Sequence, residues 1–512
     1  MRGKSEMRCQ RIVACLPGPV KPDCPVPTPM SAFLDVPSEV LLLIISYLNV
    51  PEVFLLRQIC REVSQLTRDK SLWLAFLEHL RNSGEIPLPS AASDPAVPDV
   101  DLSSATIESI VVSATRVSDS WLLPREIRPI PTAVPGEVID GLSIFLDTWL
   151  LIVYANGLVY LRSIREHAPQ RGHYATLDLR DGARKRWMHA ASLAPGNNRI
   201  MLALSNTFAP FETVLYEIDI DSTDSTGADF KLLQTFAGHR TRTIRALDVA
   251  SRLLVLSSAA GALDVVSWDS ERQHPSTMSL DSDEGAEERF DGVVSIRLLG
   301  SHFLAIRTHT IELHACNDAA RPERSMLPLK HRLPFPLREG SISVSDVITT
   351  STADSGARSI RINVLAYDAH SLASYAVSIF LPSLMDDVHP AMDVALTGEV
   401  RPAPSQAHTG VSVTRSHWFV SALALGSQAI RAMWVERHSL TMTRHVRLCT
   451  LNRNATMHEM KTAARVFTLA SYDLREDLTH CALAEVSGHI VLGNRAGNVF
   501  LLTPTRAPQR SN

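Results

Sequence analysis

The stretch VPSEVLLLIISYLNVPEVFLLRQICREVSQLTRDKSLW, residues 36–73, carries the clearest structural signal in the chain. Pro37 suits the start of a helix because its missing N–H would have no partner there anyway. Apolar residues then recur at three- and four-residue spacing, which predicts one helical stripe of Val40, Leu41, Ile44, Ile45 and Leu48. Leu42 and Leu43 extend the apolar surface to another side, so this helix needs partners on more than one face.

Two further helices are predicted after Asn49 and Pro51, which interrupt the first one. Pro51 begins the second helix, whose apolar side consists of Val53, Leu56, Ile59 and Val63. The third begins near Ser71, a capping type of residue, and carries Leu72, Trp73, Phe76 and Leu77. Three helices in about fifty residues bury little surface of their own. We therefore expect a docking module whose partner covers the remaining apolar surface.

This stretch resembles the F-box family. The family pattern begins L-P-x-E-[IV]-L, continues with an aliphatic, an aromatic–Leu and an acidic–aliphatic pair, and ends with V-C-[RK] and L-W. Here it reads Val36-Pro37-Ser38-Glu39-Val40-Leu41, Ile44-Ile45, Tyr47-Leu48, Glu52-Val53, Ile59-Cys60-Arg61 and Leu72-Trp73. Val36 replaces the usual Leu, and Val63 stands where a Trp is usual; both changes keep an apolar side chain. A helical hairpin that packs on its own C-terminal domain is the alternative.

The resemblance implies that these helices bind a Skp-family adaptor and, through it, a cullin. The residues that match the motif and are expected to dock are Pro37, Glu39, Val40, Leu41, Ile44, Leu48, Leu56, Ile59, Cys60, Leu72 and Trp73. Glu39 is expected to contribute as a carboxylate early in its helix. Some of these residues must face the core of the module instead, and the sequence does not assign which.

Composition limits the remaining functions. A chain of 512 residues is long enough for two or more domains, and a net charge of -4 does not favour bulk nucleic-acid binding. The longest apolar run, residues 40–45, is too short to span a bilayer. Residues 1–30 are basic and Pro-rich without a continuous apolar segment, so we expect a disordered tail and no secretory signal.

The cysteines indicate a reducing compartment and no cofactor. The seven cysteines include no C-x-x-C pair, which suits the cytosol or nucleus better than a disulfide framework. Cys9, Cys15 and Cys24 lie close together in the sequence, but they have no histidine partners, so no metal is predicted.

Residue composition and predicted secondary structure change along the chain and indicate five segments. We predict a tail at 1–30, the F-box domain at 31–82, a linker at 83–136 with a short helical piece around 107–112, a strand-rich domain at 137–505, and a tail at 506–512.

The strand-rich part shows a repeat. Seven hairpin-like runs turn near residues 156, 209, 261, 309, 370, 426 and 497, the first at the strong turn signal Asn156-Gly157. Turns at intervals of about fifty residues, with paired strands in each unit, are typical of β-propeller blades. The last gap has room for another hairpin around residues 446–471. The sequence therefore predicts a mainly β fold with a propeller of seven blades, or eight, and a β-sandwich is the main alternative.

One unit resembles a WD-repeat blade. Gly238-His239 precedes Trp268-Asp269, and Asp248 lies between them in the place of the aspartate that typically joins the blade turns by hydrogen bonds. Gly488-His489 repeats the first dipeptide too near the C-terminus to complete a unit, and the other units lack both dipeptides. The resemblance implies a degenerate WD-like propeller; a chance pairing of the dipeptides is the alternative.

Ring closure needs a strand shared between the first and last blades. We expect residues 142–146 to supply it to the blade that ends near Leu502. Deletion of residues 137–147 should then destabilise the whole domain.

No catalytic constellation is found. The sequence lacks phosphate-binding, nucleophile-elbow and zinc-protease motifs, and its 19 histidines are scattered singly. Two basic clusters could clamp acidic or phosphorylated peptides through bidentate hydrogen bonds: Arg184, Lys185 and Arg186, and Arg240, Arg242 and Arg245. Solvated loops are the alternative for both. The acidic run at 281–288 is expected to be an exposed loop.

Together these features imply a non-catalytic substrate receptor of an SCF-type cullin–RING ubiquitin ligase. Its propeller would hold an unknown protein substrate, and tethering would raise the effective concentration of the substrate's lysines. A propeller scaffold that uses its F-box for non-degradative assembly is the main alternative. A propeller enzyme would require a cluster of titratable side chains at the central channel.

Overall fold

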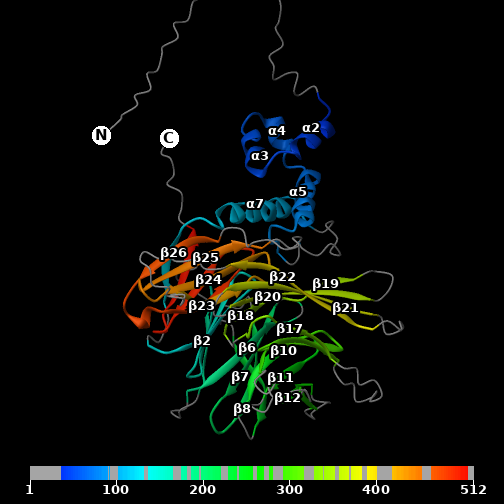
Figure 1. The fold of residues 1–512 in the computed structure, drawn as a ribbon. Helices are drawn as coiled ribbons and strands as arrows, with labels where there is room; N and C mark the ends of the chain where they lie inside the picture. Colours follow the sequence, from blue (N-terminus) through cyan, green and yellow to red (C-terminus); the bar gives the residue numbers. More distant parts are fainter. Residues whose placement is uncertain are drawn as a thin grey trace, which may run out of the picture. The chain divides into compact units, whose positions relative to one another are not determined.

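The computed structural model describes residues 36–89, 92, 102–131, 136–164, 174–180, 186–194, 196, 198–220, 229–238, 242–257, 262–269, 276–280, 292–315, 328–337, 340–351, 357–367, 371–382, 389–400, 418–451 and 463–504. The chain divides into two compact units, Met1–Phe76 and Leu77–Asn512. The described part of the first is helical, and that of the second is mainly β (Figure 1). They are called the helical unit and the propeller unit below.

The helical unit contains α2 (Ser38–Ile45), α3 (Val50–Leu56), α4 (Arg61–Leu66) and the first half of α5 (Lys70–Ser83). The single helix predicted to run from Pro51 through Val63 is therefore wrong, because α3 and α4 are separate. Arg57 explains the break: its Nε donates to Thr67 Oγ1 (3.0 Å) and its Nη2 to the Thr67 carbonyl (2.8 Å). These bonds bring the end of α3 to the end of α4, which one straight helix could not do.

Local capping and a small core hold the helical unit together. Asn49 and Glu52 form a capping box at the start of α3. At α5 the cap is Asp69 and not Ser71, since Asp69 Oδ1 accepts from the Ser71 backbone N–H (2.8 Å). The buried core consists of Leu41, Ile45, Val50, Val53, Val63, Leu72, Trp73 and Phe76. Trp73 also donates its indole N–H to the Thr67 carbonyl (2.9 Å).

The propeller unit is built from seven antiparallel sheets in the described residues. Blade 1 contains β2 (Ile139–Phe145), β3 (Trp149–Tyr154), β4 (Leu158–Ser163) and β5 (Tyr174–Asp178); blade 2 contains β6 (Trp187–Leu193), β7 (Arg199–Asn206), β8 (Glu212–Asp219) and β9 (Phe230–Ala237); blade 3 contains β10 (Thr243–Asp248), β11 (Leu253–Ser257), β12 (Ala262–Ser267) and β13 (Ser276–Ser279). Blade 4 contains β14 (Val293–Leu298), β15 (His302–Arg307), β16 (Thr310–Ala315) and β17 (Leu329–Arg332). Blade 5 contains β18 (Ile342–Val344), β19 (Ile348–Ser351), β20 (Arg358–Tyr367), β21 (Leu372–Leu381) and β22 (Ala391–Val400). Blade 6 contains β23 (Trp418–Leu425), β24 (Arg431–His438), β25 (Thr443–Thr450) and β26 (Ala464–Ala470); blade 7 contains β27 (Leu478–Leu483), β28 (Ile490–Asn494), β29 (Val499–Pro504) and β1 (Arg125–Ile130).

The sheets close into a ring, and the ribbon in Figure 1 follows them in chain order from cyan to red. Inner strands of neighbouring blades touch from β27 through β2, β6 and β10 to β14, and from β18 through β23 back to β27. Arg297 of β14 closes the remaining gap by donating to the Val344 carbonyl of β18 (3.1 Å). The prediction of a mainly β propeller with seven blades is confirmed. The run at 446–471, considered for an eighth blade, contributes β25 and β26 to blade 6.

A separate apolar cluster fills each of the seven blade junctions. Because a blade lies between two neighbours, its middle strands bury both faces. In β28, for example, every residue from Ile490 to Asn494 is buried. This double burial explains why the middle strands read as unbroken apolar runs instead of alternating with polar residues.

The closing strand differs from the one predicted. Residues 142–146 do not close the ring: β2 is the innermost strand of blade 1, where Leu142 pairs with Ile152. Closure comes from β1, which pairs with β29 from Arg125↔Pro504 to Ile130↔Val499. Pro129 is tolerated there because β1 is an edge strand, where a missing N–H need not break a ladder.

Residues 83–136 are therefore more than a linker. Besides β1 they contain α7 (Ser104–Ser120), which is longer than the helix expected at 107–112. Trp121 directly follows α7 and is buried in the cluster between blades 6 and 7. Its indole N–H donates to the Cys449 carbonyl (3.1 Å), and the guanidinium carbons of Arg125 and Arg431 lie 5.2 and 4.9 Å from its ring centre. Burial lowers the pKa of both arginines to about 10, so both stay charged at neutral pH.

Asp248 does not take the role predicted for it in a WD-like network among the described residues. Asp248 caps its own turn, where its carboxylate accepts from Ala250 N (3.0 Å) and Ser251 Oγ (2.6 Å). Asp269 pairs with Arg252 (3.4 Å), and His239 lies outside the described residues. Other bonds join the inner strands. Ser421 Oγ donates to the Leu478 carbonyl (2.7 Å), and Leu425 N donates to Ser343 Oγ (2.9 Å).

Candidate protein-docking surfaces

The helical unit exposes an unusual amount of apolar side chain for its size. Six large apolar residues of its described part are exposed: Val40, Leu43, Ile44, Tyr47, Leu55 and Ile59. Tyr47 is 83% exposed and Leu55 63%. These six residues are called the helical patch. Clustered exposed apolar surface of this kind marks interaction sites in soluble proteins.

The helical patch exists because α2 is apolar on both sides. Leu41 and Ile45 lie one turn apart on the side that enters the core, whereas Val40 and Ile44 lie one turn apart on the exposed side. The core beneath is stiffened by Arg57, whose guanidinium lies 4.8 Å from the Phe54 ring and 5.3 Å from the Trp73 ring. The exposed side chains are thus presented on a fixed support.

The structure sorts the residues that the motif match singled out. Pro37, Glu39, Val40, Ile44 and Ile59 are exposed; Leu48, Leu56 and Cys60 are half-buried; Leu41, Leu72 and Trp73 are buried. The last three contact the core of the helical unit. Leu43, Tyr47 and Leu55 are also exposed, although they are not among the docking residues that the motif match predicts. The signal for Tyr47 was present, because it is the aromatic position of the matched pattern.

Arg186 and Arg242, one described residue from each basic cluster, lie at the same end of the blades. Arg186 is exposed, and its carbonyl accepts from Thr207 N (2.8 Å) in the β7–β8 turn. The Arg242 carbonyl accepts from Ser205 Oγ (2.9 Å) at the end of β7. Arg184, Lys185 and Arg240 lie outside the described residues, as does the acidic run at 281–288.

The described arginines of the second cluster are used within the fold. Arg242 pairs with the buried carboxylate of Asp264 (3.2 Å). Arg245 Nε donates to Ser257 Oγ (2.7 Å), and its Nη1 reaches the Val294 carbonyl of the next blade (3.5 Å). The structure therefore does not present Arg242 and Arg245 as a clamp. Among the described members of the two clusters, only Arg186 offers an exposed side chain.

One group of titratable side chains lies on three neighbouring inner strands. Asp140 of β2 contacts His189 of β6, with 2.8 Å between Oδ2 and Nδ1. Burial lowers the pKa of His480 on β27, while Asp140 acts to raise it. His189 packs directly on Gly141, where an added Cβ would lie 1.9 Å from its ring. The group therefore joins β27, β2 and β6 by close packing, and no metal-binding group of three side chains occurs among the described residues.

Comparisons with known proteins gave one family match and several similar structures. The F-box-like family matches residues 33–77. No curated protein matches the chain. Structures similar to this chain include the WD40 domain of SCAP from fission yeast (11% identity, TM-score 0.41, covering 74% of this chain and 98% of that one). They also include a mitotic checkpoint complex chain (11%, 0.40, 74% and 91%) and the C-terminal WD40 domain of Sif2 (9%, 0.42, 74% and 99%).

F-box-like domains are typically non-catalytic and mediate protein interactions. Within the part of the chain that is described, no helix is long and apolar enough to cross a membrane. Residues 33–77 of this chain thus match the F-box-like family, and the described residues that follow them form a seven-bladed β-propeller.

Proposed function

We propose that this protein is a substrate receptor of an SCF-type cullin–RING ubiquitin ligase. The helical patch, in the segment that matches the F-box-like family, is the observation that carries the proposal. A Skp-family adaptor would cover it and recruit the cullin. The propeller would hold a protein substrate, and other subunits would transfer ubiquitin.

The proposed adaptor contact is the exposed surface of α2, of the end of α3 and of the segments that follow these two helices. It comprises Pro37, Glu39, Val40, Leu43, Ile44, Tyr47, Leu55 and Ile59. Leu48, Leu56 and Cys60 would contribute their exposed parts. Leu41, Leu72 and Trp73 would act through the core, because burial leaves them no surface for a partner. Covering one half-exposed aliphatic side chain contributes about 1 kcal/mol, so several together support a stable complex.

The mechanism is tethering. A substrate held by the propeller and a conjugating enzyme brought by the cullin would share one assembly, and the substrate's lysines would meet the ubiquitin thioester at high effective concentration. No catalytic group from this chain is required. In the scaffold alternative, the same adaptor contact would form but ubiquitylation would not follow.

The test is reconstitution with adaptor, cullin and RING subunits. The Ile44→Asp/Leu55→Asp variant places charge in the helical patch without touching the core, and Gln65→Asp adds a charge at another exposed position of the same unit. We expect wild type and Gln65→Asp to assemble with the cullin and support ubiquitylation, and the double variant to lose both. Assembly without ubiquitylation of any bound protein would favour the scaffold. Assembly that survives the double variant would contradict the proposed contact.

A further inference from the structure

We propose that the junction of blades 6 and 7 is a docking surface for a linear protein segment that combines a carboxylate with a large apolar side chain. The surface, called the junction surface, consists of Leu440, Tyr472, Leu474, Arg475 and Arg495. The inference rests on the proposed function, since it gives the substrate-holding propeller a site and a ligand chemistry.

The apolar part of the junction surface is strongly exposed. Tyr472 is 84% exposed, Leu440 71% and Leu474 48%. They come from two neighbouring segments, the β24–β25 turn and the β26–β27 connection, which Ser471 N joins by donating to the Met442 carbonyl (3.2 Å). Leaving three large apolar groups in water on adjacent segments is unfavourable without a partner, and Tyr and Arg are the residues enriched where partners bind most tightly.

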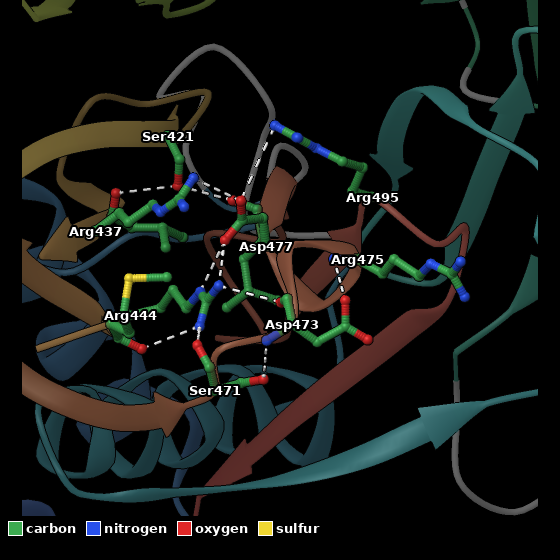
Figure 2. A network of polar contacts seen from close by, with 11 residues as sticks. Ser421, Arg437, Arg444, Ser471, Asp473, Arg475, Asp477 and Arg495 are labelled. Carbon is green, nitrogen blue, oxygen red and sulfur yellow. Dashed lines mark hydrogen bonds and ion pairs between the residues drawn. The ribbon is translucent and has the colours of Figure 1, made fainter. Parts of the chain in front are cut away.

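The backbone beneath these side chains is held by the buried carboxylate of Asp477 (Figure 2). Asp477 accepts from Arg437 Nη1 (2.6 Å) and from Arg444 Nε (2.9 Å). Arg444 in turn donates to the carbonyls of Met442 and Ser471, one in each of the two segments. The segments are therefore ordered before a ligand arrives, which lowers the entropic cost of binding.

The β28–β29 turn is hydrogen-bonded to the backbone of the same β26–β27 connection. Arg495 N donates to the Asp477 carbonyl (2.9 Å), and Ala496 N donates to the Arg475 carbonyl (3.0 Å). Asp473 caps the short 3₁₀ turn Leu474–Glu476 by accepting from Arg475 N (2.9 Å). The β28–β29 turn thus lies beside the apolar residues and brings Arg495 to their border.

Arginines outnumber carboxylates around Asp477. The Asp477 carboxylate forms ion pairs with three guanidinium groups, those of Arg437, Arg444 and Arg495. Arg495 makes the weakest contact, at 4.0 Å, and its side chain is 56% exposed. Arg475 is also exposed, and Figure 2 shows its guanidinium directed away from Asp477. Asp473 and Glu476 are exposed in the same segment, so four arginines stand against three carboxylates. A ligand carboxylate at Arg495 would complete the pairing.

The junction surface lies at the end of the blades opposite to the residues around α7. Trp121 binds the Cys449 carbonyl near the far end of β25, and Gln428 of the β23–β24 turn bonds Leu88 there. A ligand on the junction surface would therefore not compete with these contacts.

The probe is a library of random linear peptides displayed on phage and selected on the full-length chain. We expect selected peptides to combine Asp or Glu with a large apolar residue. A representative synthetic peptide should lose affinity by about tenfold or more with Tyr472→Ser and with Arg495→Glu. Phe208→Ser, which alters an exposed aromatic of the β7–β8 turn, is the matched control and should bind normally. Replacing the peptide carboxylate by lysine should restore binding to Arg495→Glu.

Selection that yields no such peptides, or binding that is unchanged in both junction variants, would overturn the proposal. Adaptor binding is measured on the same variants. It should be normal in all of them, so a failure of the junction surface is distinguishable from a failure of the helical patch. Equal melting temperatures confirm that the exposed substitutions leave the fold intact.

Discussion

Trp121 offers the sharpest test of how residues 83–136 belong to the propeller. Its side chain is 1% exposed, fills the cluster between blades 6 and 7, and stacks against the guanidinium groups of Arg125 and Arg431. Truncating a buried Trp to Ala costs about 3–5 kcal/mol, and losing two cation–π contacts adds about 0.5–2 kcal/mol each. Trp121→Ala should therefore lower the free energy of unfolding by about 4 kcal/mol or more.

A second substitution separates the ring from its hydrogen bond. Trp121→Phe keeps an aromatic group but removes the indole donor to the Cys449 carbonyl, which should cost about 0.5–1.5 kcal/mol. The assay is urea unfolding followed by β-sheet circular dichroism. A loss below about 1 kcal/mol for Trp121→Ala would refute the reasoning, because a truly buried anchor cannot be removed so cheaply.

Three other outcomes follow from the fold. Deleting Arg125–Ile130 removes the closing strand and should abolish the cooperative unfolding transition of the propeller. A deletion confined to residues 36–76 should leave that transition in place. An intact transition without β1 would show that its pairing with β29 is not needed to close the ring. Asp477→Asn leaves Arg444 buried without its counter-charge and should cost about 3–5 kcal/mol in urea unfolding; a change within about 0.5 kcal/mol would count against the network. Burial raises the pKa of Asp147 above the ordinary 3.8, so the stability that its protonated form contributes is full below that pH and is lost as the pH rises through the folded-state pKa. The unfolding free energy of wild type relative to Asp147→Asn should thus fall as the pH rises from about 3.8, and an opposite slope would show that the carboxylate is stabilised when charged.

The sequence predicts the helical unit well because its motif is dense and local. The Pro37 start of α2 is confirmed. The predicted single stripe is not, because Leu41 and Ile45 are buried whereas Val40 and Ile44 are exposed, and Leu48 follows the end of α2. Apolar periodicity does not predict the break between α3 and α4, because the contact between Arg57 and Thr67 is a tertiary one. Which apolar residues are exposed and which form the core also depends on the packing of α2 against the other helices.

The propeller could be predicted from the spacing of its turns, but its closure could not. β1 reads as Arg-Glu-Ile-Arg-Pro-Ile, and charges with a proline conceal a strand. The hairpin at Gly426 joins β23 to β24, while the one at Gly497 joins β28 to β29. This change of position within the blade lengthened the last gap and suggested room for an eighth blade.

The sequence also indicates some of the candidate site residues and not others. Arg242 and Arg245 appear in the sequence as a basic cluster, but Asp264 and Ser257 are the partners that occupy them. The junction surface gave no sequence signal, because Leu440, Tyr472 and Arg495 come from three separate turns. Only the ring brings them together.

The helical patch is the proposed binding surface for a Skp-family adaptor. The most direct measurement is calorimetric titration of the purified adaptor into the full-length chain and into Ile44→Asp, with melting temperatures measured for both. We predict saturable binding to wild type and an affinity loss of about tenfold or more for an equally stable Ile44→Asp. Absence of binding to wild type, or the same dissociation constant for both proteins, would contradict the account.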